Sequence, residues 1–203
     1  MSLEIVIFQI IVLIYSAIIH EYMHGWMAHR LGDNTAKDMG RLTLNPVPHI
    51  DPIGSILLPF ILIASGASFV FGWAKPVPYN PYNLRDQKYG GAKVAIAGPM
   101  ANLIVALAFG LILRFIPFAT PEMSYFIQII VFINLLLMVF NLVPIPPLDG
   151  SKVLMPFLPI GVQEKFMMLE QYGMFLVFAF VWFGFDLIIP IIYFFFSLVT
   201  GIS

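Results

Sequence analysis

Two histidines and a glutamate lie close together within a long apolar stretch of the chain. His20, Glu21 and His24 form the pattern His-Glu-x-x-His, preceded by the mainly apolar residues 3–19. Histidines at positions i and i+4 of a helix share one face, so both imidazoles can bind a single metal ion. Glu21 could then act as general base toward a water molecule. The alternative is that the histidines are only polar side chains at a helix end. An ionisable side chain inside a membrane helix costs about 2.5–3.5 kcal/mol, which favours a functional role.

The composition is that of a polytopic membrane protein. Of the 203 residues, 60% are hydrophobic and 10% are charged, a balance that few soluble domains show. The net charge of −1 argues against nucleic acid as a partner. The N-terminus lacks the basic region and the cleavage site of a signal peptide, so residues from Leu3 onward should remain as a membrane span. We expect one domain over residues 1–203 in the lipid bilayer.

The apolar stretches predict about four spanning helices and one shorter membrane segment. The predicted helices cover residues 3–31, 92–113 and 123–143, and a last apolar stretch covers residues 172–199 with interruptions at Gly184, Asp186 and Pro190. Ile53–Val70 is also apolar, but it is broken by Pro59 and Gly66. Arg41–Leu44 alternates between polar and apolar side chains and could form a short strand.

The positions of the basic residues indicate whether Ile53–Val70 crosses the membrane. If it crosses, the ten basic residues divide four to six between the two sides, which favours neither orientation. If it enters the membrane and returns, nine lie on one side and only Arg114 lies opposite. The positive-inside rule therefore favours a re-entrant segment and places His20 and His24 near the cytoplasmic face. Such a segment needs protein or a water-filled cavity to satisfy its backbone.

A catalytic zinc ion usually has three protein ligands and one open position. The chain contains no cysteine, so a third ligand must be histidine or a carboxylate. The candidates are His29, His49, Asp51, Asp149 and Asp186. We favour Asp149, because the re-entrant topology brings it level with the histidines and the prolines before it interrupt a helix beside them. A plain turn remains the alternative there. His29 falls on another helix face, His49 and Asp51 are more typical of loop capping, and Asp186 is more typical of a loop or kink.

Two motifs together resemble those of the site-2 protease family of intramembrane zinc metalloproteases. The first is His20-Glu21-x-x-His24, and the second is Asn141-x-x-Pro144-x-Pro146-x-x-Asp149-Gly150. Residues 41–52, 71–77 and 98–102 also resemble the compact bacterial branch, and the chain has no room for the PDZ or CBS modules of larger members.

The resemblance implies one zinc ion per chain, bound by His20, His24 and Asp149. It implies that Glu21 is the catalytic base and that Asn141 orients substrate or stabilises the oxyanion. It further implies a three-helix catalytic core, re-entrant β-structure and a location in a bacterial or archaeal cell membrane. We therefore expect an α-helical polytopic membrane protein with about four spanning helices and a re-entrant segment that carries short β-strands near these residues.

The implied reaction is hydrolysis of peptide bonds in membrane-spanning protein or peptide substrates near the cytoplasmic face. Asn102 could also donate a hydrogen bond to the oxyanion, or could equally serve only to join helices. A strand edge near Arg41–Leu44 or Val70–Trp73 could hold the substrate extended. A metal-ion transporter or channel would use the same ligands but gives Glu21 no clear role. A third possibility is a catalytically inactive membrane scaffold.

Overall fold

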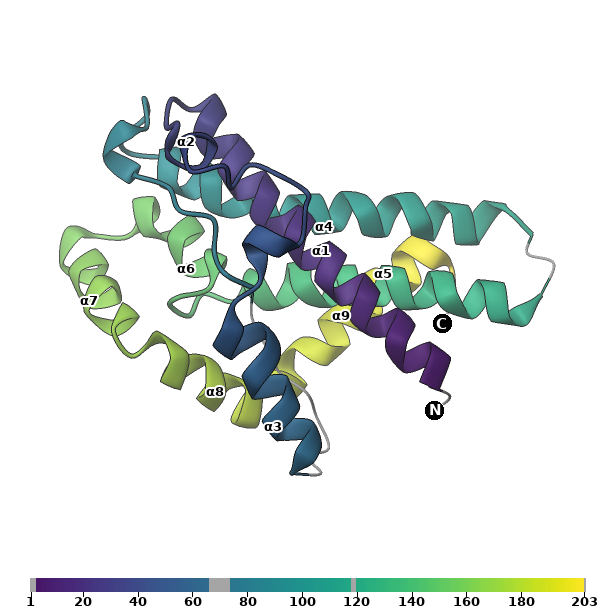
Figure 1. Cartoon of the computed structure of the whole chain (residues 1–203). Coiled ribbons are helices and arrows are strands. Elements are labelled where there is room, and N and C mark those ends of the chain that lie inside the picture. The colour runs from purple at the N-terminus through teal and green to yellow at the C-terminus, as the bar shows by residue number, and fades with distance from the viewer. Residues whose placement is uncertain (1–2, 66–73, 118–119, 203) are drawn as a thin grey trace.

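A computed structural model describes residues 3–65, 74–117 and 120–202, and the regular structure of these residues is helical. Three long helices form the centre of the molecule: α1 (Leu3–Arg30), α4 (Gly90–Phe115) and α5 (Pro121–Asn141) (Figure 1). Each is long and apolar enough to cross a membrane. Their bounds lie within two residues of the helices predicted from the sequence.

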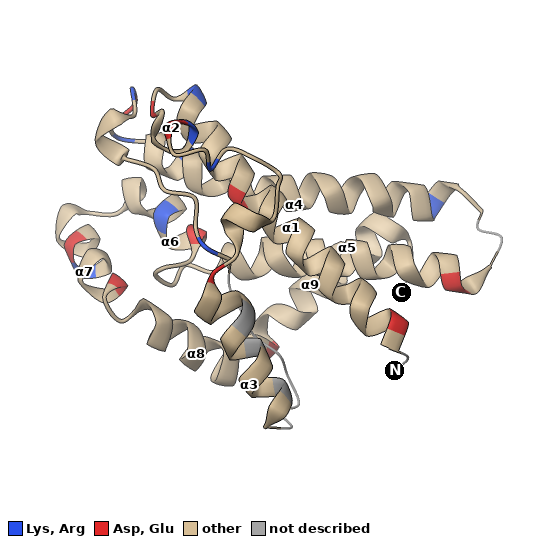
Figure 2. Ribbon diagram, viewed as in Figure 1, with Lys and Arg blue, Asp and Glu red and all other residues tan. Residues whose placement is uncertain are grey.

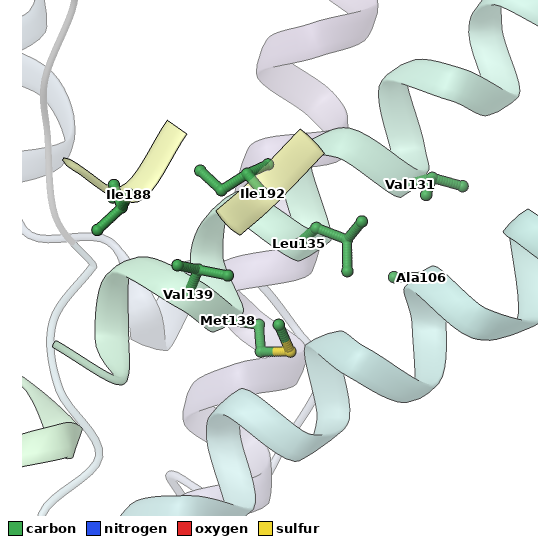
Figure 3. Close-up of a cluster of buried hydrophobic side chains, with 7 residues drawn as sticks. All are labelled: Ala106, Val131, Leu135, Met138, Val139, Ile188 and Ile192. Carbon is green, nitrogen blue, oxygen red and sulfur yellow. The ribbon is translucent and has the colours of Figure 1, made fainter. Parts of the chain in front are cut away.

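The core of the bundle lies between α4, α5 and the C-terminal helix α9 (Phe185–Thr200). Figure 3 shows its fully or nearly buried side chains, which are Ala106, Val131, Leu135, Met138, Val139, Ile188 and Ile192. Helix α1 packs on the other side against α4 and α5. Its buried polar side chains Ser16, His20 and His24 recur every fourth residue, so one face of α1 turns toward α4.

Shorter elements surround these helices. They are α2 (Thr35–Asp38), a 3₁₀ turn at Val47–His49, a π-helix at Pro52–Leu57, α3 (Leu58–Ala64), a 3₁₀ turn at Pro81–Asn83, α6 (Asp149–Leu154), a 3₁₀ turn at Met155–Phe157, α7 (Ile160–Glu170) and α8 (Gly173–Phe183). Helices α7 and α8 meet at 87° and together form one bent candidate span. The described residues therefore contain three candidate spans, or up to four with this pair.

The last apolar stretch, residues 172–199, is two helices. Gly184 ends α8 and separates it from α9, whereas Pro190 lies inside α9 without ending it. Helix α9 has 16 residues, or about 24 Å at 1.5 Å per residue, which is shorter than the roughly 30 Å hydrocarbon layer. It packs against α4 and α5.

The predicted short strand at Arg41–Leu44 is wrong, and the described residues contain no strand. The backbone of this segment is bonded elsewhere: the N–H of Arg41 donates to the carbonyl of Ala36, and the carbonyl of Thr43 accepts a hydrogen bond from Nε2 of His49 at 2.9 Å. The Arg41 side chain, which alternation would place on one face of a sheet, is instead buried and donates to the carbonyls of Lys75 and Pro76. The second predicted strand position, Val70–Trp73, lies outside the described residues.

The re-entrant segment predicted at Ile53–Val70 is helical where it is described. Asp51 caps its start by accepting hydrogen bonds from the backbone N–H groups of Ile53 and Gly54, and the helix continues to Ala64. The described helix is too short to cross a membrane alone. Residues 66–73 lie outside the described part, so the re-entrant path stays a prediction.

Charged residues are unevenly distributed along the bundle. Figure 2 shows most Lys and Arg residues at the end where α2 and α6 lie. Arg114, in the last turn of α4, is at the opposite end of that helix. This arrangement agrees with the uneven division of basic residues on which the predicted topology depends.

Candidate active site

Helix α1 supplies two of the predicted site residues directly. His20 and His24 are 6% and 8% exposed, and their ring centroids lie 4.6 Å apart. His20, Glu21 and His24 each offer one potential ligand atom, and these atoms lie within 4.8 Å of one another. The i, i+4 spacing of the histidines within one continuous helix accounts for this geometry.

Asp149 reaches the histidines from the start of α6. Its Oδ2 atom lies 3.0 Å from Nε2 of His20 and 3.2 Å from Nε2 of His24. The chain turns back after α5, and Gly150 makes this turn possible because a Cβ atom there would collide with the backbone carbonyl of Leu142.

A chain of buried hydrogen bonds determines which nitrogen of His20 carries the proton. The Asn134 amide nitrogen donates to the backbone carbonyl of Ile130 at 2.9 Å, so its Oδ1 faces Asn102. The Asn102 amide nitrogen donates to that oxygen at 3.0 Å and to the carbonyl of Ser16 at 3.2 Å. Oδ1 of Asn102 is therefore the atom 2.6 Å from Nδ1 of His20, and His20 must donate through Nδ1. Its Nε2 is left with a free lone pair.

The same logic applies to His24. Its Nδ1 lies 2.8 Å from the backbone carbonyl of Val94, which can only accept, so Nδ1 carries the proton. Two nitrogen lone pairs and the Oδ2 atom of Asp149 thus converge on one point from α1 and α6. Three electron-rich atoms arranged in this way could bind a cation.

Glu21 lies beside this cluster and is half-buried. Its Oε2 atom accepts a hydrogen bond of 2.8 Å from the backbone N–H of Val77. The Val77 side chain also lies against Gly25, one helical turn further along α1. The segment before α4 therefore fixes the orientation of the Glu21 carboxylate.

Two asparagines that the sequence singled out have different surroundings. Asn141 is the last residue of α5, is half-buried, and donates its amide to the carbonyl of Leu137 in its own helix. Asn102 is fully buried and contacts the Nδ1 side of His20, away from Asp149. Its bonds to α1 and α5 support the role of joining helices over that of an oxyanion donor.

The other ligand candidates have roles outside the cluster. His29 bonds the Asn34 side chain at 2.7 Å, His49 is buried and bonds Thr43, and Asp51 caps a helix. Asp186 lies in the first turn of α9. Sequence reasoning missed Asn134 and the backbone groups of Val94 and Val77. The available signal was Asn134 itself, a polar residue within an apolar helix.

Membrane-length helices bring a His-Glu-x-x-His pattern against an aspartate, and these are the residue types of a metalloprotease site. Residues 115–184 match peptidase family M50. The chain is 40% identical over 186 residues to YwhC of Bacillus subtilis, covering 87% of this chain and 80% of YwhC. It is 34% identical over 163 residues to Rip2 of Mycolicibacterium smegmatis, covering 80% of this chain and 61% of Rip2. It is 43% identical over 101 residues to MJ0611 of Methanocaldococcus jannaschii, covering 49% of this chain and 50% of MJ0611.

All three relatives bear the name "putative zinc metalloprotease". The chain belongs to peptidase family M50, the site-2 protease family, and its enzyme class is zinc metalloprotease. No solved structure matches it significantly.

Proposed function

We propose that this chain is an intramembrane protease that hydrolyses peptide bonds of membrane-spanning protein substrates near the cytoplasmic face. In this proposal His20, His24 and Asp149 bind one zinc ion and Glu21 is the general base. The observation that carries it is the convergence of two Nε2 lone pairs on one carboxylate oxygen, at 3.0 and 3.2 Å.

The donor set fits zinc. Tetrahedral zinc with N and O ligands at about 2.0–2.2 Å holds its ligand atoms roughly 3.3 Å apart, close to both distances here. Two neutral imidazoles and one carboxylate are typical ligands of a catalytic site that keeps a fourth position open. When bound, zinc supplies a Lewis acid that polarises the scissile carbonyl and lowers the pKa of water toward about 7.

The residues of the chain supply the proton transfers and the orientation. Glu21 accepts a proton from the attacking water and later donates it to the nitrogen of the departing amine. The N–H of Val77 holds the Glu21 carboxylate in one orientation, which lowers the entropic cost of that transfer. Asn141 has a second amide hydrogen beyond the one bonded to Leu137, and we assign that hydrogen to the oxyanion or to the substrate backbone.

The proposed cytoplasmic position rests on the basic residues. They gather at the end of the bundle where α2 and α6 lie, and α6 carries Asp149 (Figure 2). A substrate helix hides its peptide bonds, so it must unwind locally before water can attack a peptide carbonyl held beside Asp149 and the two histidines.

Glu21→Gln tests the proposal. Glutamine still accepts a hydrogen bond from Val77 through its carbonyl oxygen, but it cannot take a proton from water. We expect the variant to keep its zinc while cleavage of a reconstituted single-span peptide falls about 10²–10⁴-fold. Glu4→Gln is the matched control, since Glu4 lies at the far end of the same helix and should leave cleavage unchanged.

Two outcomes would contradict the assignment. A Glu21→Gln variant that cleaves at the unaltered rate would leave the reaction without its base. A variant that loses zinc as well would make Glu21 a ligand or a structural residue. Zinc content and single-turnover cleavage should therefore be measured on the same sample.

A further inference from the structure

Helix α4 presents a glycine to the two histidines of α1. Gly98 is buried in the interior of α4, and a Cβ atom built on it would lie 2.6 Å from Nε2 of His20. The same atom would be nearer still to Nε2 of His24, and 2.6 Å from its Cε1. Contacts under 3.0 Å essentially never occur for real Cβ atoms, so a side chain at this position would have to displace the rings.

The two rings are not free to move away. His20 is held through its Nδ1 by Asn102, and His24 is held through its Nδ1 by the carbonyl of Val94. Both anchors are on the side of each ring opposite to Nε2. A methyl group at position 98 would therefore occupy the space between the two Nε2 atoms, because these atoms cannot retreat without breaking buried hydrogen bonds.

That space borders the two nitrogen atoms of the proposed metal site. Zinc lies about 2.0–2.1 Å from a histidine nitrogen, and the hypothetical Cβ would lie 2.6 Å from Nε2 of His20 and nearer to Nε2 of His24. A methyl group and a coordinated metal cannot share this volume. We propose that Gly98 keeps the coordination sphere open, so that the absence of a side chain at position 98 is a requirement for metal loading. This inference rests on the proposed function for the identity of the ligands.

Close helix packing is the competing explanation for a glycine in a membrane helix. Gly110 of the same helix has that role, since a Cβ there would collide with the Val199 side chain of α9. Gly98 differs because its nearest neighbours are the ligand atoms of two histidines. Gly91, in the first turn of α4, faces open space with nothing within 4 Å.

Gly98 and Asn102 are separated by one helical turn and share a face of α4. Asn102 fixes the ring of His20 through Nδ1, and Gly98 leaves room beyond its Nε2. Helix α4 thus contributes a positioning surface to the site although it supplies none of the proposed ligands.

Three alanine substitutions in α4 test the proposal on the full-length protein in detergent. Gly98→Ala should lose its zinc, measured as metal per chain after equilibration with zinc, and should lose the visible absorption that cobalt gives when it replaces zinc. Gly91→Ala should bind one zinc like the unaltered chain. Gly110→Ala should also bind zinc but show a lower melting temperature. Alanine favours a helix over glycine, so loss of helicity is not expected at position 98.

The metal-free forms separate loading from packing. After chelation, we expect Gly98→Ala to stay helical but to melt below the chelated unaltered chain, because the methyl group displaces the two rings from their buried hydrogen bonds. A Gly98→Ala variant that binds zinc with unaltered affinity would overturn the proposal. A Gly98→Ala variant that loses its zinc only because it no longer folds, seen as lost helical circular dichroism, would overturn it as well, since the glycine would then serve packing. Failure of the proposed function would instead appear as an unaltered chain without zinc, or as cleavage that survives Glu21→Gln.

Discussion

Nδ1 of His20 lies 2.6 Å from Oδ1 of Asn102, and the asparagine is completely buried between α1, α4 and α5. The Asn102 amide nitrogen bonds Asn134 on α5 and the backbone of Ser16 on α1. Helices α4 and α5 supply no proposed ligand, but Asn102 and Asn134 on them determine the tautomer and the orientation of the His20 ring. Partners of this kind raise ligand basicity and keep the ring in place.

Asn102→Leu should weaken zinc binding about 10–100-fold, the usual effect of removing such a partner. Leucine fills the space but leaves the Nδ1–H of His20 without an acceptor, so the ring can shift its proton to Nε2. Competition with a chromogenic chelator measures the change. Asn134→Leu removes only the far end of the chain of bonds and should cost less. Equal zinc affinity in Asn102→Leu and the unaltered chain would refute this positioning role.

Asp149→Asn should abolish tight zinc binding while keeping the size of the side chain. The carboxylate oxygen that lies near both histidines would be replaced by a neutral amide, a much weaker ligand. Asp186→Asn is the matched control, because Asp186 also lies in the first turn of a helix and was itself a candidate ligand. The zinc content of the two variants shows which of the two acids is the third ligand. If Asp186→Asn loses zinc and Asp149→Asn keeps it, the third ligand has been assigned to the wrong acid.

The local parts of the site could be predicted from sequence, because helical periodicity alone brings His20 and His24 together. Asp149 required one further step, the topology inferred from the basic residues, which brought the end of α5 to the level of the histidines. The function of Asn102 could not be predicted in the same way. It depends on the mutual rotation of α1, α4 and α5, and the apolar pattern of each helix alone does not determine that rotation.

The errors in the fold have local physical causes. Alternation at Arg41–Leu44 is a strand pattern, but the Thr43 carbonyl is bonded to the side chain of His49 and no partner strand is present in the described residues. The break at Gly184 was recognised only as an interruption, because hydropathy does not distinguish a tolerated glycine or proline from one that ends a helix. Pro190 was recognised as an interruption too, but α9 continues through it.

The predicted membrane topology can be tested by cysteine labelling, since the natural chain has no cysteine. Lys37→Cys and Arg85→Cys introduce exposed thiols on either side of the Ile53–Val70 segment, and Glu122→Cys introduces one in the first turn of α5. A re-entrant segment predicts that positions 37 and 85 react with an impermeant reagent from the cytoplasmic side and position 122 from the other side. Labelling of positions 37 and 85 from opposite sides would mean that the segment crosses.

Asp33 connects the end of α1 to the segment that leads into α4. It is fully buried, and its carboxylate accepts hydrogen bonds from the backbone and hydroxyl of Thr35, the backbone N–H of Asn80 and the side chain of Asn83. Burial alone would raise the pKa of Asp33, but the bonds from Thr35, Asn83 and Asn80 outweigh it and lower the pKa below its usual range. A lowered pKa in the folded state means that the ionised carboxylate stabilises the fold.

Asp33→Asn should therefore lower the free energy of unfolding by about 1.5–3 kcal/mol at neutral pH, the range for hydrogen bonds to a charged group. The stabilisation by Asp33 is fully present above the unfolded-state pKa of about 3.9, and it declines as the pH falls through the lower folded-state pKa. The difference in melting temperature between Asp33→Asn and the unaltered chain should thus be large at pH 7 and shrink below about pH 4. Asp38→Asn, at a nearby exposed acid, should leave the melting temperature unchanged at both values. A difference for Asp33→Asn that stays constant from pH 7 to pH 3 would show that the charge of Asp33 does not stabilise this connection.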